Sequence, residues 1–169
     1  MFFWRITKYN PKNRDFNGVY LKEEWTCYSE VGDIICGRVF TFEEYLEIEN
    51  AYVSAIILFM ECNNLENLQV TNLEKNIKLK QDVHLNEEMI ALFNEAKEGL
   101  ILNKDAIKLL ARLVLREKLW CKLESKNIFV HFGWDYYMYI GSSSKCKESI
   151  RIIHQNELFV EEYESPYLD

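Results

Sequence analysis

A chain of 169 residues provides material for one hydrophobic core, so we expect a single globular domain spanning residues 1–169. The formal net charge of −7 argues against direct binding to nucleic acid, because phosphate contacts need clustered Lys and Arg side chains. Hydrophobic residues make up 49% of the chain, yet the longest apolar run, Ala55 to Met60, is far shorter than a membrane span, and we expect no membrane contact.

The N-terminal residues and the cysteines indicate a cytoplasmic protein. Met1 to Lys8 has neither the basic start nor the sustained apolar core of a secretory signal. The five cysteines form an odd set without CxxC spacing: Cys27, Cys36, Cys62, Cys121 and Cys146. We therefore predict reduced thiols, most of them buried as small hydrophobic side chains, and we expect no zinc, other metal or cofactor.

The first third of the chain predicts a strand, a meander and a long helix. Phe2 to Tyr9 alternates in the manner of a strand, and Asp15 to Arg38 is loop-like with short extended pieces. Thr41-Phe42-Glu43-Glu44 has the pattern of a capping box. The helix that follows should run to about Cys62 and becomes apolar almost all round, which predicts a buried central helix.

The remaining elements include most of the predicted strands. In chain order we predict a short strand around Leu68-Gln69-Val70, a helix from Asn86 to Gly99, a helix starting at Asn103, strands over Leu119 to Leu123, Ile128 to Phe132 and Trp134 to Ile140, a helix capped by Ser142 or Ser144 and running to about Asn156, and a strand over Leu158 to Tyr163. The polar stretch Asn72 to Asn86 is the expected flexible loop. Because strands cluster late rather than alternate with helices, we predict an α+β fold: a largely antiparallel sheet packed against the buried central helix and about three further helices.

Candidate catalytic residues are few. His131 lies beside Cys121 if their strands pair, which would give a Cys/His nucleophile pair and a small enzyme. The sequence contains no HExxH, Walker-type, GxGxxG or GxSxG motif. A buried thiol and a hydrogen-bonded strand histidine are the more ordinary interpretation, and we expect no catalytic residue.

One strand of the predicted sheet offers aromatic side chains to a protein partner. Alternation assigns Trp134, Tyr136, Met138 and Ile140 to the core face of this strand. The opposite face carries a carboxylate and two tyrosines, namely Asp135, Tyr137 and Tyr139. Tyrosine is enriched in protein interfaces, so we predict that this second face binds a partner. The alternative is that other elements cover both faces.

The C-terminal stretch from Gln155 to Asp169 is acidic and contains no Lys or Arg. Its candidate partner-binding residues are Glu161, Glu162 and Glu164. Such a patch can steer a basic partner onto the protein, although a solvated acidic edge that deters sheet pairing has the same composition.

Two segments, Leu115-Arg116-Glu117-Lys118-Leu119-Trp120-Cys121 and Phe129-Val130-His131-Phe132-Gly133-Trp134-Asp135-Tyr136-Tyr137-Met138-Tyr139, resemble bacterial immunity proteins of contact-dependent inhibition and related polymorphic-toxin systems. Phe42-Glu43-Glu44-Tyr45-Leu46 adds to the similarity. The resemblance implies a cytoplasmic inhibitor that binds a cognate toxin domain, often a nuclease, and blocks its active site. Our leading hypothesis is therefore an immunity protein against a basic nuclease domain. A Cys/His-dependent enzyme, and a ligand-binding or adaptor domain with a pocket between the sheet and the Thr41 helix, remain open.

Overall fold

A computed structural model describes residues 1–76 and 82–168 of the chain. Within these residues one antiparallel sheet has the strand order β5-β4-β6-β7-β8-β1-β9. Its strands are β1 (Phe2–Thr7), β4 (Asn67–Lys75), β5 (Ile101–Asn103), β6 (Leu119–Glu124), β7 (Ile128–Phe132), β8 (Tyr137–Ser142) and β9 (Phe159–Glu162). The helices are α1 (Phe42–Cys62), α2 (Glu87–Glu95), α3 (Lys104–Leu115) and α4 (Lys147–Gln155). The predicted α+β class is confirmed.

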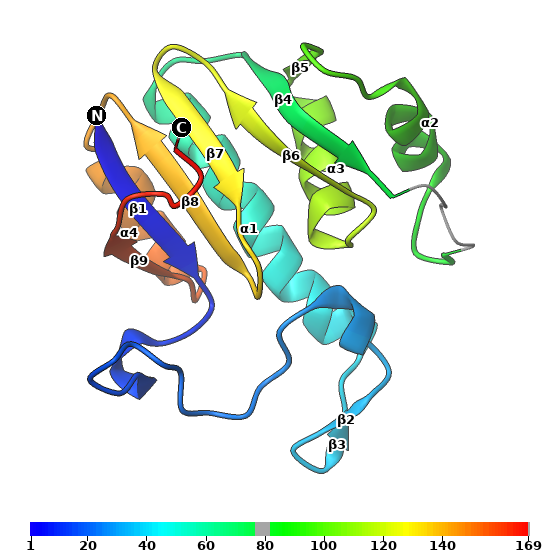
Figure 1. Ribbon diagram of the computed structural model, residues 1–169, viewed down its shortest axis with the longest axis vertical. Helices are drawn as coiled ribbons and strands as arrows, with labels where there is room; N and C mark the ends of the chain where they lie inside the picture. The colour runs from blue at the N-terminus through cyan, green and yellow to red at the C-terminus, as the bar shows by residue number, and fades with distance from the viewer. Residues whose placement is uncertain (77–81, 169) are drawn as a thin grey trace.

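The sheet has one face covered by helices and one face open to other contacts. In Figure 1, α1, α3 and α4 lie behind the sheet, whereas the red C-terminal segment crosses in front of it. Strand alternation sends Met138 and Ile140 of β8 toward the helices and Tyr139 toward the open face. Directly paired residues share a face, so Arg5 of β1, which pairs with Tyr139, also lies on the open face.

Helix α1 is the buried central helix that the sequence predicts. Its capping box forms as expected, with the Glu44 amide donating to Thr41 Oγ1 at 3.2 Å and the Thr41 amide donating to the Glu44 carboxylate at 3.0 Å. The large side chains of its middle turns, Tyr52, Ile56 and Phe59, are fully buried. A helix that is apolar on most sides can be stable only at the centre of a core, and this one lies across the back of the sheet.

A buried ion pair joins α1 to the end of α3. Glu49 has no exposed surface, and its carboxylate accepts from Arg116 Nε at 2.6 Å and Arg116 Nη2 at 2.7 Å. The Tyr45 hydroxyl donates to the same carboxylate at 3.0 Å, and Arg112 Nε lies 3.3 Å from it. The two-pronged geometry and the extra donors satisfy a charge that burial alone would make very unfavourable.

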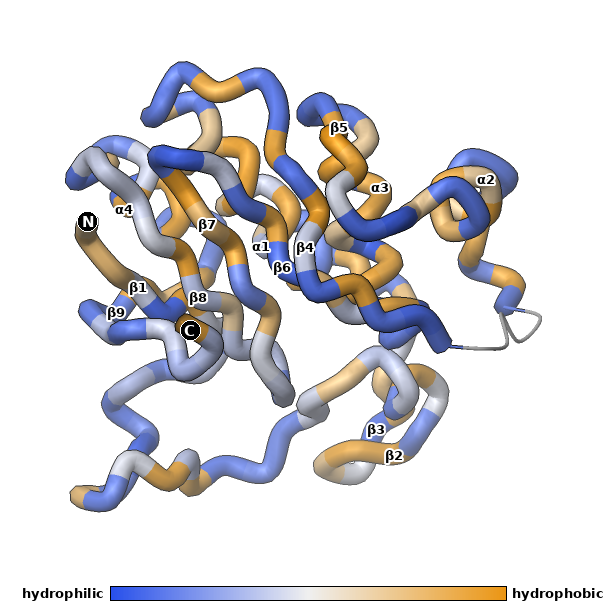
Figure 2. The backbone as a smooth tube through the Cα atoms, turned by 45° about the horizontal axis from the view of Figure 1, so that its top comes forward, coloured by the Kyte–Doolittle hydropathy of each residue, from blue (hydrophilic) through white to orange (hydrophobic). Residues whose placement is uncertain are grey.

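The meander between β1 and α1 contains the short strands β2 (Ile34–Ile35) and β3 (Arg38–Val39) and two single 3-10 turns, Pro11–Asn13 and Tyr28–Glu30. Figure 2 shows it as a largely hydrophilic tube that turns hydrophobic at β2. Trp25 anchors the meander, because its ring stacks on Phe40 with centroids 4.3 Å apart and meets the Tyr136 ring edge-on at 5.0 Å. The predicted loop-like character of this region is confirmed.

Several boundaries differ from the prediction because pairing partners lie far away in sequence. Strand β4 extends to Lys75, well into the polar stretch predicted as a loop, since it pairs along β6. Residues 77–81 of that predicted loop lie outside the described residues. Strand β5 was not predicted, and it exists because its three residues pair with β4. Helix α2 ends at Glu95 rather than at Gly99.

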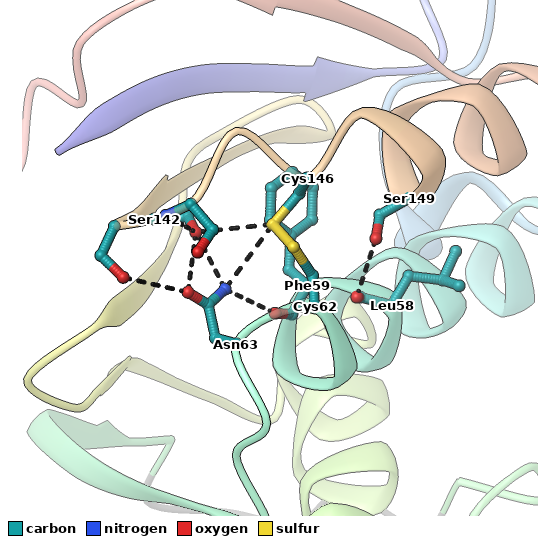
Figure 3. Close-up of a disulfide and its surroundings, with 9 residues drawn as sticks. Leu58, Phe59, Cys62, Asn63, Ser142, Cys146 and Ser149 are labelled. Carbon is teal, nitrogen blue, oxygen red and sulfur yellow. Dashed lines mark hydrogen bonds between the residues drawn. A yellow bond between two sulfur atoms is a disulfide. The ribbon is translucent and has the colours of Figure 1, made fainter.

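The prediction that all five cysteines are reduced thiols is wrong for two of them. Cys62, at the end of α1, and Cys146, just before α4, form a disulfide with Cα atoms 5.7 Å apart. Cys146 is also the N-cap of α4, so the predicted cap by Ser142 or Ser144 is wrong. Asn63 ties the same junction together, because its Nδ2 donates to Ser142 Oγ and to the Phe59 carbonyl, both at 2.8 Å (Figure 3).

The other three cysteines are free. Cys121 is fully buried on the helix side of β6, as predicted for a small hydrophobic residue, whereas Cys27 is half-buried and Cys36 is exposed. Odd cysteine number and irregular spacing are compatible with one bridge as well as with none, so only the three-dimensional approach of α1 and α4 decides the pairing.

Candidate binding surface

The C-terminal segment forms a strap, residues 163–168, across the open face of the sheet (Figure 1). The Tyr163 amide donates to the Phe3 carbonyl at 3.2 Å, and Lys122 Nζ donates to the Tyr167 carbonyl at 2.7 Å. The strap therefore runs from β1 to β6. The Arg5 guanidinium adds a cation–π contact, 4.5 Å from the Tyr163 ring centroid.

The strap buries part of the predicted partner-binding face. Tyr139 is only 7% exposed, because the rings of Tyr163 and Tyr167 lie on either side of it with centroids 5.9 Å away. The strap thus covers Tyr139 in this structure, as the alternative that other elements cover both faces expects. Glu161 forms an internal ion pair, since Arg5 Nε donates to its carboxylate at 3.0 Å. A segment distant in sequence makes these contacts, so strand alternation could not reveal them.

Ser165, His131 and Glu124 form a chain that resembles a nucleophile, a base and an orienting carboxylate. Ser165 Oγ lies 2.8 Å from His131 Nδ1, and Glu124 Oε1 lies 3.3 Å from His131 Nε2. Ser165 is 5% exposed and also accepts a hydrogen bond from the Tyr167 amide at 3.2 Å. This geometry fixes the turn of the strap on the sheet and leaves the hydroxyl covered.

Cys121 and His131 do not meet. Their strands pair as expected, but the register places Lys122, not Cys121, opposite His131, so Cys121 projects toward the helices and His131 toward the strap. Burial raises the pKa of the Cys121 thiol to about 12. The proposed Cys/His nucleophile pair is therefore not assembled in this fold.

The β7–β8 turn places Trp134 on the surface. The sequence pattern assigned Trp134 to the core, but strand β8 starts only at Tyr137 and Trp134 is 83% exposed. The reversal lies at Trp134-Asp135-Tyr136-Tyr137, where the Tyr137 amide donates to the Trp134 carbonyl at 3.1 Å and the Gly133 amide donates to the Tyr137 carbonyl at 2.6 Å. Alternation of side chains holds only within a strand, and the turn interrupts it.

This turn is held rigidly although it contains an unfavourable backbone conformation. Asp135 and Tyr136 have φ of 54° and 58°, the pair of positive angles of a type I′ turn, which usually contains Asn and Gly. The Tyr52 hydroxyl donates to the Tyr136 carbonyl at 2.5 Å and accepts from the Lys8 amide at 2.8 Å. The Tyr136 ring is 7% exposed, so burial of this side chain holds the turn in place.

A cavity of about 740 Å³ opens beside the turn, at the edge where β4 and β7 end and β6 and β8 begin. We call it the sheet-end cavity. Its lining includes seven aromatic residues: Tyr52, Trp120, Phe132, Trp134, Tyr136, Tyr137 and Tyr167. Three carboxylates, Glu74, Glu117 and Asp135, and one ammonium group, Lys75, also line it. The volume lies within the range of small-molecule and side-chain binding sites.

The predicted site residues divide between three environments. Asp135 and Tyr137 line the sheet-end cavity, and Tyr52 of α1 also contributes to its wall. Glu162 and Glu164 are exposed, on β9 and the strap respectively. Tyr139 and Glu161 belong to the covered face described above. The cavity therefore unites only two of the six residues that the sequence indicated.

Three residues of the cavity were not among the predicted site residues: Trp134, Glu74 and Glu117. A signal for Trp134 was present, because Gly133 marks a bend and a short connection between antiparallel strands must contain a turn. Glu74 and Glu117 gave no such signal, since they come from the ends of different elements and meet only when β4 pairs with β6.

Cys27 also lines the cavity, and burial raises the pKa of its thiol, which disfavours the reactive thiolate. Among the residues with described positions, no group of three His, Cys, Asp or Glu side chains could hold a metal ion. None of the helices described is long and apolar enough to cross a membrane. Comparison with models of known protein families, with curated proteins and with solved structures finds no match to this chain.

Proposed function

We propose that this protein is an immunity protein that binds a cognate toxin domain through Trp134 and the sheet-end cavity and blocks the active site of the toxin. The observation that carries the proposal is the exposed Trp134, 83% accessible, on a turn whose Tyr136 is buried and hydrogen-bonded through its carbonyl. Tryptophan is among the residues that contribute most to binding energy at interface centres.

The β7–β8 turn is already ordered in the free protein, and this favours binding of a partner to Trp134. A flexible loop would lose conformational freedom when it docks, whereas the buried Tyr136 ring has already fixed this turn in the free protein. The positive φ of Tyr136 costs about 1–2 kcal/mol, because a left-handed backbone crowds the Cβ atom. Strain of this kind is retained where a particular arrangement of side chains is useful.

Further exposed apolar residues extend the surface at this end of the molecule. The meander and the β7–β8 turn both lie at the lower end in Figure 1. Five large apolar side chains of the meander are exposed, namely Phe16, Val19, Leu21, Ile34 and Val39. Exposed apolar groups next to carboxylates are typical of a protein-binding surface.

Charge supports a basic partner. The chain has a formal net charge of −7, and carboxylates outnumber cations among the described residues that line the sheet-end cavity. An acidic surface accelerates encounter with a basic nuclease domain and discriminates against acidic proteins. Direct binding to nucleic acid is disfavoured for the same reason.

We place the protein in the cytoplasm, where an immunity protein meets its toxin. The Cys62–Cys146 disulfide argues against this placement, because cytoplasmic thiols are mostly kept reduced. Two further contacts support this junction: the Ser149 hydroxyl of α4 donates to the Leu58 carbonyl of α1 at 3.0 Å, and Asn63 bonds Ser142 at the end of β8.

The test starts from the genes beside the one for this chain: if one of them encodes a secreted protein, its C-terminal domain is co-expressed with this chain. We expect the wild-type chain to restore growth and to form a one-to-one complex. Trp134→Ala should weaken the complex about 30-fold, the effect of losing a hot-spot side chain worth about 2 kcal/mol. Ile101→Ala is the matched control, because Ile101 is also exposed, at 67%, but lies on the far edge strand β5.

Two results would refute the proposal. One is a wild-type chain that neither binds the toxin domain nor protects cells from it. The other is a Trp134→Ala variant, folded by circular dichroism, that binds the toxin as tightly as the Ile101→Ala control.

A further inference from the structure

The lining of the sheet-end cavity has the chemistry of a site for an organic cation. Trp120, half-buried, and Trp134, exposed, contribute indole rings to its wall. The face of an indole ring attracts a cation through its quadrupole more strongly than the face of a phenol or benzene ring does. Tyr167 of the strap adds a third ring, whose centroid lies 5.8 Å from that of Trp120.

Among residues 1–76 and 82–168, no cationic side chain pairs with the carboxylates of the cavity. Glu74, Glu117 and Asp135 are exposed, and none of them forms an ion pair with another described residue. Lys75, the lysine among the described lining residues, directs its ammonium group to α2, where it donates to the Asn94 carbonyl at 3.3 Å and lies 5.1 Å from the Phe93 ring centroid. Within the described part of the lining, three carboxylates therefore face one ammonium group.

The backbone maintains this arrangement at a cost. Glu117 and Asp135 have φ of 60° and 54°, in the left-handed region that favours glycine. Glu117 follows the end of α3, where glycine is the usual residue. Glu117 and Asp135 thus have strained backbone conformations. Glu74 comes near Glu117 because β4 pairs with β6.

We infer that the sheet-end cavity receives an arginine side chain of the protein partner. This inference rests on the proposed function, since it names the group by which a basic partner is recognised. Arginine fits better than lysine because its flat guanidinium stacks on aromatic rings and presents several N–H donors to carboxylates at once. The exposed Trp134 forms the rim over which the aliphatic part of such a side chain passes.

The direct test uses the full-length protein and small probes, without any toxin. The probes are the capped tripeptide acetyl-Gly-Arg-Gly-amide, the same tripeptide with citrulline, which is the neutral counterpart of arginine, and free arginine. The readout is the shift of the indole N–H signals of Trp120 and Trp134 in two-dimensional NMR. We expect the arginine tripeptide to shift both signals and to bind at least 10-fold more tightly than the citrulline tripeptide.

Replacing two carboxylates of the cavity by amides tests whether the arginine tripeptide binds there. Glu74→Gln/Glu117→Gln should weaken binding of the arginine tripeptide at least 10-fold. Glu47→Gln/Glu61→Gln is the matched control, because it removes the same net charge from exposed positions of α1 outside the cavity, and it should retain the wild-type affinity. A chain-wide electrostatic effect would weaken both variants equally and would overturn the inference.

The remaining outcomes separate this inference from the proposed function. Equal binding of the arginine and citrulline tripeptides overturns the inference but not the function, because protection against the toxin is measured independently. Free arginine that binds 10-fold more tightly than the tripeptide identifies a small-molecule ligand and overturns the assignment to a partner. Selective binding of the arginine tripeptide by a chain that protects against no toxin supports the cavity chemistry and refutes the immunity function alone.

Discussion

Reduction of the Cys62–Cys146 disulfide should destabilise the purified, oxidised protein. The bridge joins residues 84 positions apart, so it restricts a long loop in the unfolded chain. The chain-entropy relation gives a loss of about 4.6 kcal/mol at 25 °C for a loop of this length. We expect a measured loss of about 2–4 kcal/mol, because an unfolded chain retains some structure and such relations overestimate its freedom.

The assay is urea unfolding of the oxidised protein, with and without reductant. With a denaturant dependence of about 2 kcal/mol per molar urea, a loss of 3 kcal/mol lowers the midpoint by about 1.5 M. Cys62→Ser/Cys146→Ser should reproduce the lower midpoint without reductant. Cys36→Ser, which removes an exposed free thiol, should leave the midpoint unchanged.

Counting thiols checks the pairing itself. The denatured, unreduced protein should expose the three free thiols, and reduction should raise the count to all five cysteines of the chain. Five thiols without reductant, together with a midpoint that reductant does not move, would refute both the pairing and its contribution to stability.

Three further predictions concern stability. Glu49→Leu leaves the buried Arg116 guanidinium without its counterion and should lower the free energy of unfolding by about 3–5 kcal/mol. The double variant Glu49→Leu/Arg116→Met should recover much of that loss, because it removes both charges. Urea unfolding of the single and double variants measures both effects. Burial lowers the pKa of Lys8 from 10.5 to about 8. Between these two pH values the unfolded chain therefore binds more protons than the folded protein does. Stability should therefore rise by about 1.5 kcal/mol from pH 8 to 9.5, and a Lys8→Met variant that keeps the same rise would disprove this origin. Gly141→Ala should cost about 1–3 kcal/mol in thermal unfolding, since a Cβ atom there would lie 2.1 Å from the Phe129 ring; an unchanged melting temperature would show that the ring moves away freely.

Local patterns in the sequence determined the elements whose stability is local. Thr41 and Glu44 cap α1 through hydrogen bonds between residues three positions apart, so the four-residue motif was sufficient to predict them. The apolar composition of α1 required burial on most of its surface, and that requirement indicated a central helix before any neighbour was known. The predicted strands cluster late in the sequence and do not alternate with helices, and this order indicated an antiparallel sheet and the α+β class.

Tertiary structure alone decided which of those elements meet and what covers them. Tyr139 and Tyr137 share a face of β8, yet the two tyrosine rings of the strap pack on Tyr139. The pattern of β8 could not predict this contact, because α4 and β9 separate the strap from the strand in the sequence. Cys62 pairs with Cys146 because α4 packs on α1, a contact that spacing along the chain does not encode. The carboxylates of the sheet-end cavity converge through the register of β4 on β6. Side-chain periodicity reports one residue's position relative to its own backbone, whereas a binding site depends on the distances between backbones.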